Sequence, residues 1–208
     1  FNSDIISVPI ERCYNLSQME VIARPLPEVE NIDELEGVKI IKPKIFPDAR
    51  GFFSETYNAK EWKELLGFDQ TFVQDNHSFS HHGVTRGMHA QPGMGKLVSV
   101  TLGRIFDVIV DARPGSTTFG KWKGVFLDGE NKHSLWVPDG FLHGFQVVSK
   151  EGAHVVYKCS GVFNSKTEFG IDPFDSTLSI EWPESDPAKC IISERDRKHP
   201  PFETLKRS

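Results

Sequence analysis

Apolar and polar residues alternate with a period of two through most of residues 72–157. The segment "KLVSVTL" places Val98, Val100 and Leu102 on one face and its serine and threonine on the other, and "FDVIVDAR" and "HVVYKC" alternate similarly. This period is typical of strands that cover one side of a core. Because the strands are short and separated by turn residues, the pattern predicts an all-β sandwich or barrel.

Outside these strands the pattern predicts one clear helix before the C-terminal region. In "NAKEWKELLG", Asn58 is a candidate N-cap, Glu61 follows three residues later, and Gly67 is a stop signal. Residues 1–36 contain the acidic, proline-bearing run "RPLPEVENIDELEG" and have no clear period. We therefore expect an N-terminal arm, residues 1–36, laid over a domain formed by residues 37–208.

Composition narrows the class of protein. The chain has 208 residues, 38% of them hydrophobic and 25% charged, with no apolar run long enough to span a membrane. A net charge of −5 argues against nucleic-acid binding through overall basicity, although it allows a local cationic pocket. Three widely spaced cysteines and no signal-peptide pattern favour a soluble protein of the reducing cytoplasm.

Eight histidines raise the possibility of a metal site. In "WVPDGFLHGF", Pro138, Gly140 and His143 have the spacing of the second cupin motif, whose histidine often binds metal. The matching hairpin would need a histidine pair and a carboxylate, but "MHAQPGMGK" supplies His89 alone. The sequence thus predicts no bound metal, and His143 is either a structural histidine or part of a metal-free site.

The glycine-rich segment "RGMHAQPGMGK" carries Arg86, His89 and Lys96 with no acidic residue nearby. Its glycines permit a ligand to approach the backbone closely. By contrast, His81 and His82 lie in a polar turn and are expected to be solvated. The segment is a candidate anion pocket.

Many segments together resemble one family. In this order and spacing, they are similar to the dTDP-4-dehydrorhamnose 3,5-epimerase family, the RmlC-like cupins, from about Val38 to about Pro201. The segments are "DARGFFSE", "FVQDNHS", "GVTRGMHAQ", "GKLVSVTLGRIFDVIVDAR", "TFGKW", "LWVPDGFLHGF", "VVYKCS" and "ISERDR".

The resemblance implies a cupin-type jelly-roll β-barrel with a few short peripheral helices. It also implies a homodimer with strand exchange, acting without metal or other cofactor on a nucleotide-diphospho-4-keto-6-deoxyhexose. The implied catalytic residues are the base His89, its orienting partner Asp196, the acid Tyr157 and Lys96 near the sugar. The implied binding residues, some reaching the partner subunit, are Arg50, Phe53, Glu55, Gln74, Asn76, Arg86 and His143.

One position departs from the family pattern. Six residues after Tyr157 many members carry a second tyrosine, and this chain has Phe163, which keeps a stacking surface but lacks the hydroxyl. Inversion at both C3 and C5 is the leading expectation. Epimerisation at a single carbon, ketoisomerisation, a non-catalytic nucleotide-sugar binding subunit and, less favoured because ligands are missing, a metal-dependent cupin oxygenase are the alternatives.

Overall fold

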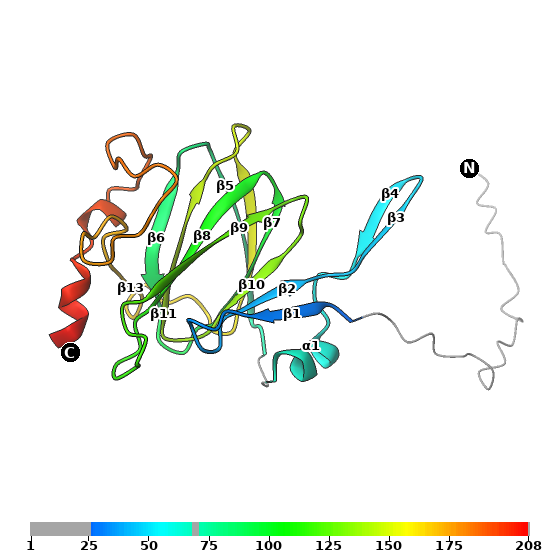
Figure 1. Cartoon of the computed structure of the whole chain (residues 1–208), viewed down its shortest axis with the longest axis horizontal. Coiled ribbons are helices and arrows are strands. Elements are labelled where there is room, and N and C mark those ends of the chain that lie inside the picture. The colour runs from blue at the N-terminus through cyan, green and yellow to red at the C-terminus, as the bar shows by residue number, and fades with distance from the viewer. Residues whose placement is uncertain (1–25, 68–70, 208) are drawn as a thin grey trace, which may run out of the picture.

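The computed structural model describes residues 26–67 and 71–207, and two antiparallel sheets dominate it (Figure 1). In spatial order, the first sheet contains β1 (Glu28–Asn31), β2 (Lys39–Lys42), β10 (Ser134–Val137), β7 (Lys96–Leu102), β12 (Ala153–Cys159) and β5 (Gln74–Ser80). The second contains β13 (Phe169–Gly170), β6 (Thr85–Ala90), β11 (Phe141–Val147), β8 (Arg104–Asp111) and β9 (Trp122–Asp128).

The arrangement is the expected jelly roll. The strand predictions in "KLVSVTL", "FDVIVDAR" and "HVVYKC" are confirmed by β7, β8 and β12. Within the described residues the two sheets are hydrogen-bonded separately, so the jelly roll is a sandwich of two facing sheets and not a closed cylinder. The space between them can therefore open at one end as a cavity.

Alternation along the strands builds the core between the sheets. Val98 and Val155 face inward from the six-stranded sheet and pack with Ile105 and Ile109 of the five-stranded sheet, all of them buried. Leu102 was expected to share the face of Val98, but it is 55% exposed. It is the last residue of β7, directly before the turn at Gly103.

The outer face of the five-stranded sheet is covered as well. Val108 and Leu142 point away from the central core and pack against Trp182 and Phe202 of the C-terminal segment. This second cluster explains why β11 is buried along its whole length. The C-terminal segment thereby fixes the short 3-10 helices Asp196–Lys198 (η2) and Phe202–Arg207 (η3) beside β6 and β13 (Figure 1).

The predicted helix is confirmed as α1, Ala59–Leu66. The side chain of Asn58 accepts hydrogen bonds from the backbone N–H groups of Lys60 and Glu61, which satisfies donors that a helix start leaves unpaired. Gly67 ends the helix in the left-handed region, at φ 73°, which glycine adopts without a Cβ clash. Across the described residues, no helix is long and apolar enough to cross a membrane.

Two N-terminal segments join the jelly roll differently. Within the predicted arm, β1 pairs with β2, and Ile32 and Leu35 are buried in the central core, so residues 28–35 are part of the sandwich. Residues 1–25 lie outside the described part, and for them the arm stays a prediction. The strands β3 (Ile45–Asp48) and β4 (Gly51–Ser54) form a hairpin that projects away from the two sheets (Figure 1).

Candidate active site

A cavity of about 820 Å³ lies between the two sheets and is lined in part by the segment that precedes η2. Its lining comes from β5, β7 and β12 on one side and from β6 and β11 on the other. Nine of the twelve site residues expected from the sequence lie here: Gln74, Asn76, Arg86, His89, Lys96, His143, Tyr157, Phe163 and Asp196.

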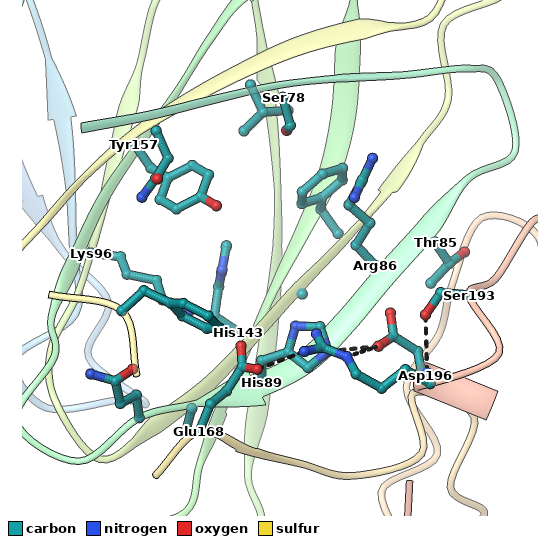
Figure 2. Close-up of a pocket in the computed structure, with 18 of the residues that line it drawn as sticks. Ser78, Thr85, Arg86, His89, Lys96, His143, Tyr157, Glu168, Ser193 and Asp196 are labelled. Atoms are coloured by element: carbon teal, nitrogen blue, oxygen red, sulfur yellow. Dashed lines mark hydrogen bonds and ion pairs between the residues drawn. The ribbon is translucent and has the colours of Figure 1, made fainter. Parts of the chain in front are cut away.

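The expected pair of His89 and Asp196 is formed, although 107 positions separate them in sequence. His89 Nε2 lies 2.8 Å from Asp196 Oδ1 (Figure 2). Because an ionised carboxylate only accepts hydrogen bonds, Nε2 carries the proton and donates it. Nδ1, which makes no hydrogen bond among the described residues, is left as the basic nitrogen.

Asp196 is held as an anion. Burial opposes its ionisation, but the hydrogen bond and charge of His89, with a donated bond from the Gly87 N–H, outweigh burial and lower the pKa of Asp196 to about 2. Ser193 Oγ accepts a hydrogen bond from the Asp196 N–H, which fixes the start of η2. The carboxylate is therefore charged at any pH near neutral.

Two glycines bring β6 and β11 close enough to pair their histidines. A Cβ on Gly87 would lie 2.6 Å from the Cα of Gly144, and Gly87 has φ 125°, a conformation that other residues rarely adopt. Next to this contact, His89 and His143 are direct partners across the two strands, and the register shifts just after His143. The "RGMH" and "LHGF" segments thus place two imidazoles side by side on one wall.

The second imidazole has its own aspartate. His143 Nε2 lies 2.8 Å from Asp107 Oδ1, and Asp107 is fully buried on β8. The sequence analysis did not identify Asp107. A signal was available, because Asp107 shares the inward face of β8 with Ile105 and Ile109, where a carboxylate without a partner would be costly.

Tyr157 and Lys96 lie on the opposite wall. Both belong to the six-stranded sheet, whereas His89 and His143 belong to the five-stranded sheet. Figure 2 shows the Tyr157 hydroxyl pointing into the cavity, on the side away from His89. Val155 and Cys159 share the inward face of β12 with Tyr157, as the alternation in "HVVYKC" predicts.

Burial in the cavity shifts the pKa values of Tyr157 and Lys96 in opposite directions. Burial raises the pKa of Tyr157, and the neighbouring Cys159 adds to the effect, so the phenol keeps its proton. Burial lowers the pKa of Lys96, against the attraction of Cys159, Glu168 and Asp107. The cavity is thus a place of weak solvation, where a charge on bound substrate interacts strongly with the wall.

Two charged residues missed by the sequence analysis complete the mouth of the cavity. Arg195 pairs with Glu168 at 2.7 Å, and its guanidinium NH2 approaches His89 Nε2 to 3.1 Å. Since Nε2 donates to Asp196, this approach joins two donors and is not a hydrogen bond. Arg195 directly precedes Asp196 in "SERD", so its position beside the dyad could have been inferred from that neighbour.

A chain of polar contacts lines the entrance on the β5 side. The backbone N–H of Phe163 donates to Gln74 Oε1, Gln74 Nε2 donates to Asn76 Oδ1, and Asn76 Nδ2 donates to Cys159 Sγ. The Phe163 ring is 49% exposed and is not core. The exposed Arg86 lies at the rim, where its Nε donates to Ser80 Oγ.

Arg50, Phe53 and Glu55 are not brought to this cavity. Arg50 and Phe53 are on the projecting β3–β4 hairpin, and Glu55 directly follows it. The Arg50 side chain is 90% exposed and pairs with Asp48, and Phe53 is 60% exposed. Nucleotide contacts by these three residues stay a prediction.

Comparison with known proteins shows which family shares this design. The sequence profile of dTDP-4-dehydrorhamnose 3,5-epimerase matches residues 33–204. The enzyme of that name from Shigella flexneri is 48% identical over 166 residues, which cover 78% of this chain and 90% of that protein.

Two solved structures extend the comparison. The dTDP-6-deoxy-D-glucose-3,5-epimerase of Legionella pneumophila, in complex with dTDP-4-keto-L-rhamnose, is 45% identical with a TM-score of 0.81, covering 85% of this chain and 93% of its own. ChmJ, a 3′-monoepimerase of Streptomyces bikiniensis in complex with dTDP-quinovose, is 31% identical with a TM-score of 0.78, covering 83% of this chain and 87% of its own.

The jelly roll and its enclosed histidine–aspartate pairs, together with these matches, define an isomerase of the cupin fold. More specifically, the chain belongs to the dTDP-4-dehydrorhamnose 3,5-epimerase family.

Proposed function

We propose that the chain inverts C3 and C5 of dTDP-4-dehydro-6-deoxyglucose to give dTDP-4-dehydrorhamnose, with His89 as base and Tyr157 as acid. The observation that carries this proposal is the placement of the two residues on opposite sheets. Inversion requires a proton to leave one face of the sugar and another to arrive on the other face. A binding protein needs no such opposition.

The ketone at C4 makes the chemistry accessible to an imidazole. Removal of a proton from C3 or C5 leaves a carbanion that delocalises onto the C4 oxygen as an enolate. His89 Nδ1 accepts the proton, and Asp196 stabilises the imidazolium formed through the bond to Nε2. Tyr157 then donates its phenolic proton to the carbon from the opposite wall.

Lys96 is assigned to the enolate oxygen. Its ammonium sits in a weakly solvated site, where stabilisation of developing negative charge contributes strongly. His143, oriented by Asp107, is assigned to the sugar beside it. The reaction written in this way uses no metal or redox cofactor.

The nucleotide is assigned to the rim and to a second subunit. Arg86 lies at the mouth as a diphosphate contact, with Gln74 and Asn76 nearby. The projecting hairpin carries exposed aromatic rings, Phe52 and Phe53, which are costly to leave in water. A homodimer in which each hairpin covers the partner's cavity would bury them and bring Arg50, Phe53 and Glu55 to the nucleotide.

A second candidate is epimerisation at one carbon only. Phe163 at the entrance provides a ring without the hydroxyl that many relatives have, and ChmJ, which shares the fold, is described as a 3′-monoepimerase. We place either activity in the cytoplasm, because Cys159 and Cys190 are buried free thiols.

Incubation with dTDP-4-keto-6-deoxyglucose in deuterated water tests the proposal. We expect NMR to show deuterium at both C3 and C5 together with the inverted product. Deuterium at one carbon would select the single-carbon alternative. No deuterium and no product would leave a binding subunit, and migration of the ketone would indicate a ketoisomerase.

A further inference from the structure

One histidine beside the site has no part in the epimerisation. His199 ends η2, and its ring lies against that of His89 with centroids 5.3 Å apart. The His199 side chain is 17% exposed, and its Nε2 is shielded from solvent and makes no hydrogen bond to the described residues. A buried polar nitrogen without a partner is unusual and calls for a ligand or another explanation.

His199 is held tightly against the dyad. A Cβ on Gly170 would lie 2.6 Å from His199 Cε1 and Nε2, so glycine at 170 makes room for the ring. The His199 N–H donates to the Asp196 carbonyl, which keeps the two residues on one turn. His199 Nε2 then faces Asp196 Oδ1 at 3.5 Å, the same oxygen that accepts the bond from His89.

The three side chains have the composition and spacing of a metal site. The ligand atoms of His89, Asp196 and His199 all lie within 4.8 Å of one another. In a tetrahedral zinc site, with bonds of roughly 2.0–2.2 Å, adjacent ligand atoms are about 3.3 Å apart. Asp196 Oδ1 lies 2.8 Å from His89 Nε2 and 3.5 Å from His199 Nε2, one distance below that value and one above it.

Charge and donor type favour a transition metal. Two neutral imidazoles and one carboxylate suit zinc and similar ions better than magnesium or calcium, which prefer oxygen ligands. The guanidinium of Arg195, 3.1 Å from His89 Nε2, opposes a cation. Arg195 is more than half exposed and is paired with Glu168, and its Nε also lies 3.5 Å from Asp196 Oδ1. Metal binding therefore requires Arg195 to give up its contacts with His89 and Asp196 while keeping Glu168.

We propose that His89, Asp196 and His199 bind one divalent transition-metal ion, and that this ion inhibits the enzyme. A metal on His89 Nε2 occupies the lone pair of that nitrogen, so the single proton of the neutral ring must sit on Nδ1. Nδ1 is the nitrogen assigned to accept the sugar proton. With the ion bound, Nδ1 already carries a proton and cannot accept one from the sugar, although the ion does not contact the substrate. This inhibitory part of the proposal rests on the proposed function.

Metal binding is tested directly on the substrate-free full chain by calorimetric titration with Zn²⁺. We expect one site per chain that His199→Phe weakens at least about tenfold, since loss of a ligand costs no less than loss of a supporting contact. His154→Phe is the matched control, because His154 and His77 form an imidazole pair at 2.8 Å that no third ligand joins in a metal-sized group among the described residues. The His154→Phe variant should bind Zn²⁺ as wild type does. A titration of wild type with Mg²⁺ should show no binding at this site.

Equal Zn²⁺ affinity in wild type and His199→Phe would overturn the proposal, as would loss of the site in His154→Phe. If His199→Phe does not fold, His199→Asn replaces it, with circular dichroism as the check. Zn²⁺ should also stop the exchange of sugar hydrogens with solvent in wild type, and a chelator should restore it. Inhibition of His199→Phe should need a Zn²⁺ concentration at least about tenfold higher. A chain with no exchange activity at all refutes the proposed function, while calorimetry still decides the metal site.

Discussion

The predicted site residues of the cavity and those of the β3–β4 hairpin differ in exposure and in their contacts. In the cavity, His89, Asp196 and Tyr157 are partly or fully enclosed, and His89 and Asp196 are hydrogen-bonded to each other. On the hairpin, which projects away from the two sheets (Figure 1), Arg50 and Phe53 are exposed. All the residues proposed for acid–base chemistry line the cavity of one chain, whereas the exposed rings of the hairpin favour a role in covering another surface.

This difference separates chemistry from recognition. Groups that move protons need fixed geometry and weak solvation, which the two sheets provide. Groups that hold a nucleotide can be supplied by a neighbouring subunit, provided that the subunits stay together. Changes in the cavity should therefore act on turnover, and changes in the hairpin on affinity and assembly.

The largest effect is expected inside the cavity. His89→Ala removes the base and should lower turnover at least about a hundredfold, the usual scale for a positioned general base. Thermal unfolding should show that the fold is kept. His81→Ala, in an exposed turn, is the control and should be close to wild type; near-normal turnover in His89→Ala would remove the base assignment.

Removal of the acid alone should uncouple the two walls. In Tyr157→Phe, His89 can still take the sugar proton and return a solvent-derived one to the same face. We expect exchange with deuterated solvent to persist while inverted product forms at least about a hundredfold more slowly, the low end of what a general acid contributes. Wild-type rates of inversion in a folded Tyr157→Phe would show that another group is the donor.

Acid stability tests the dyad independently of substrate. Because its folded pKa is about 2 and its ordinary value is 3.8, Asp196 stabilises the fold above about pH 4 and loses this contribution as the pH falls toward 2. The contribution is about 2 kcal/mol. The difference in unfolding free energy between wild type and Asp196→Asn should shrink by about that amount from pH 5 to pH 2.

A surface carboxylate supplies the control for this measurement. Asp75 is exposed and pairs with Lys158, and such pairs contribute roughly 0–1 kcal/mol. Asp75→Asn should therefore leave the acid transition nearly unchanged. An equal shift in both variants would mean that the dyad is not specially stabilised.

Mixing two defective chains tests the hairpin. Phe53→Ala should weaken nucleotide affinity about tenfold, within the range that truncation of a buried aromatic contact costs at an interface. If the hairpin serves the partner, a mixed dimer with His89→Ala has one site in which both cavity and hairpin are intact. Mixing should then restore activity to Phe53→Ala and His89→Ala chains at low substrate. No recovery, with exchange of subunits verified, would place Phe53 outside the partner's site.

The sequence identified the proposed catalytic residues of the cavity better than it identified their charged partners. Alternation in "HVVYKC" was enough to turn Tyr157 inward, and the capping residues were enough for α1, because both depend on neighbours within a few positions. The resemblance to the family also paired His89 with the distant Asp196, and the structure forms this pair. Asp107 and Glu168 were missed, because their partners are set by strand register and a loop, which local patterns do not encode.

The smallest effect is expected at the boundary between the two regions. Phe163 lies at the cavity mouth with its ring half exposed and its backbone N–H bonded to Gln74, so Phe163→Tyr adds a hydroxyl without removing a contact. Stability should change by no more than about 0.5 kcal/mol, as for other exposed positions. If the missing hydroxyl limits the enzyme to one carbon, the variant should incorporate deuterium at the second carbon while the first keeps its rate. If wild type instead exchanges hydrogen at both carbons, with a ratio of rates that Phe163→Tyr leaves unchanged, Phe163 serves only as a stacking surface. In that case the residues around His89 and Tyr157 determine which carbon reacts.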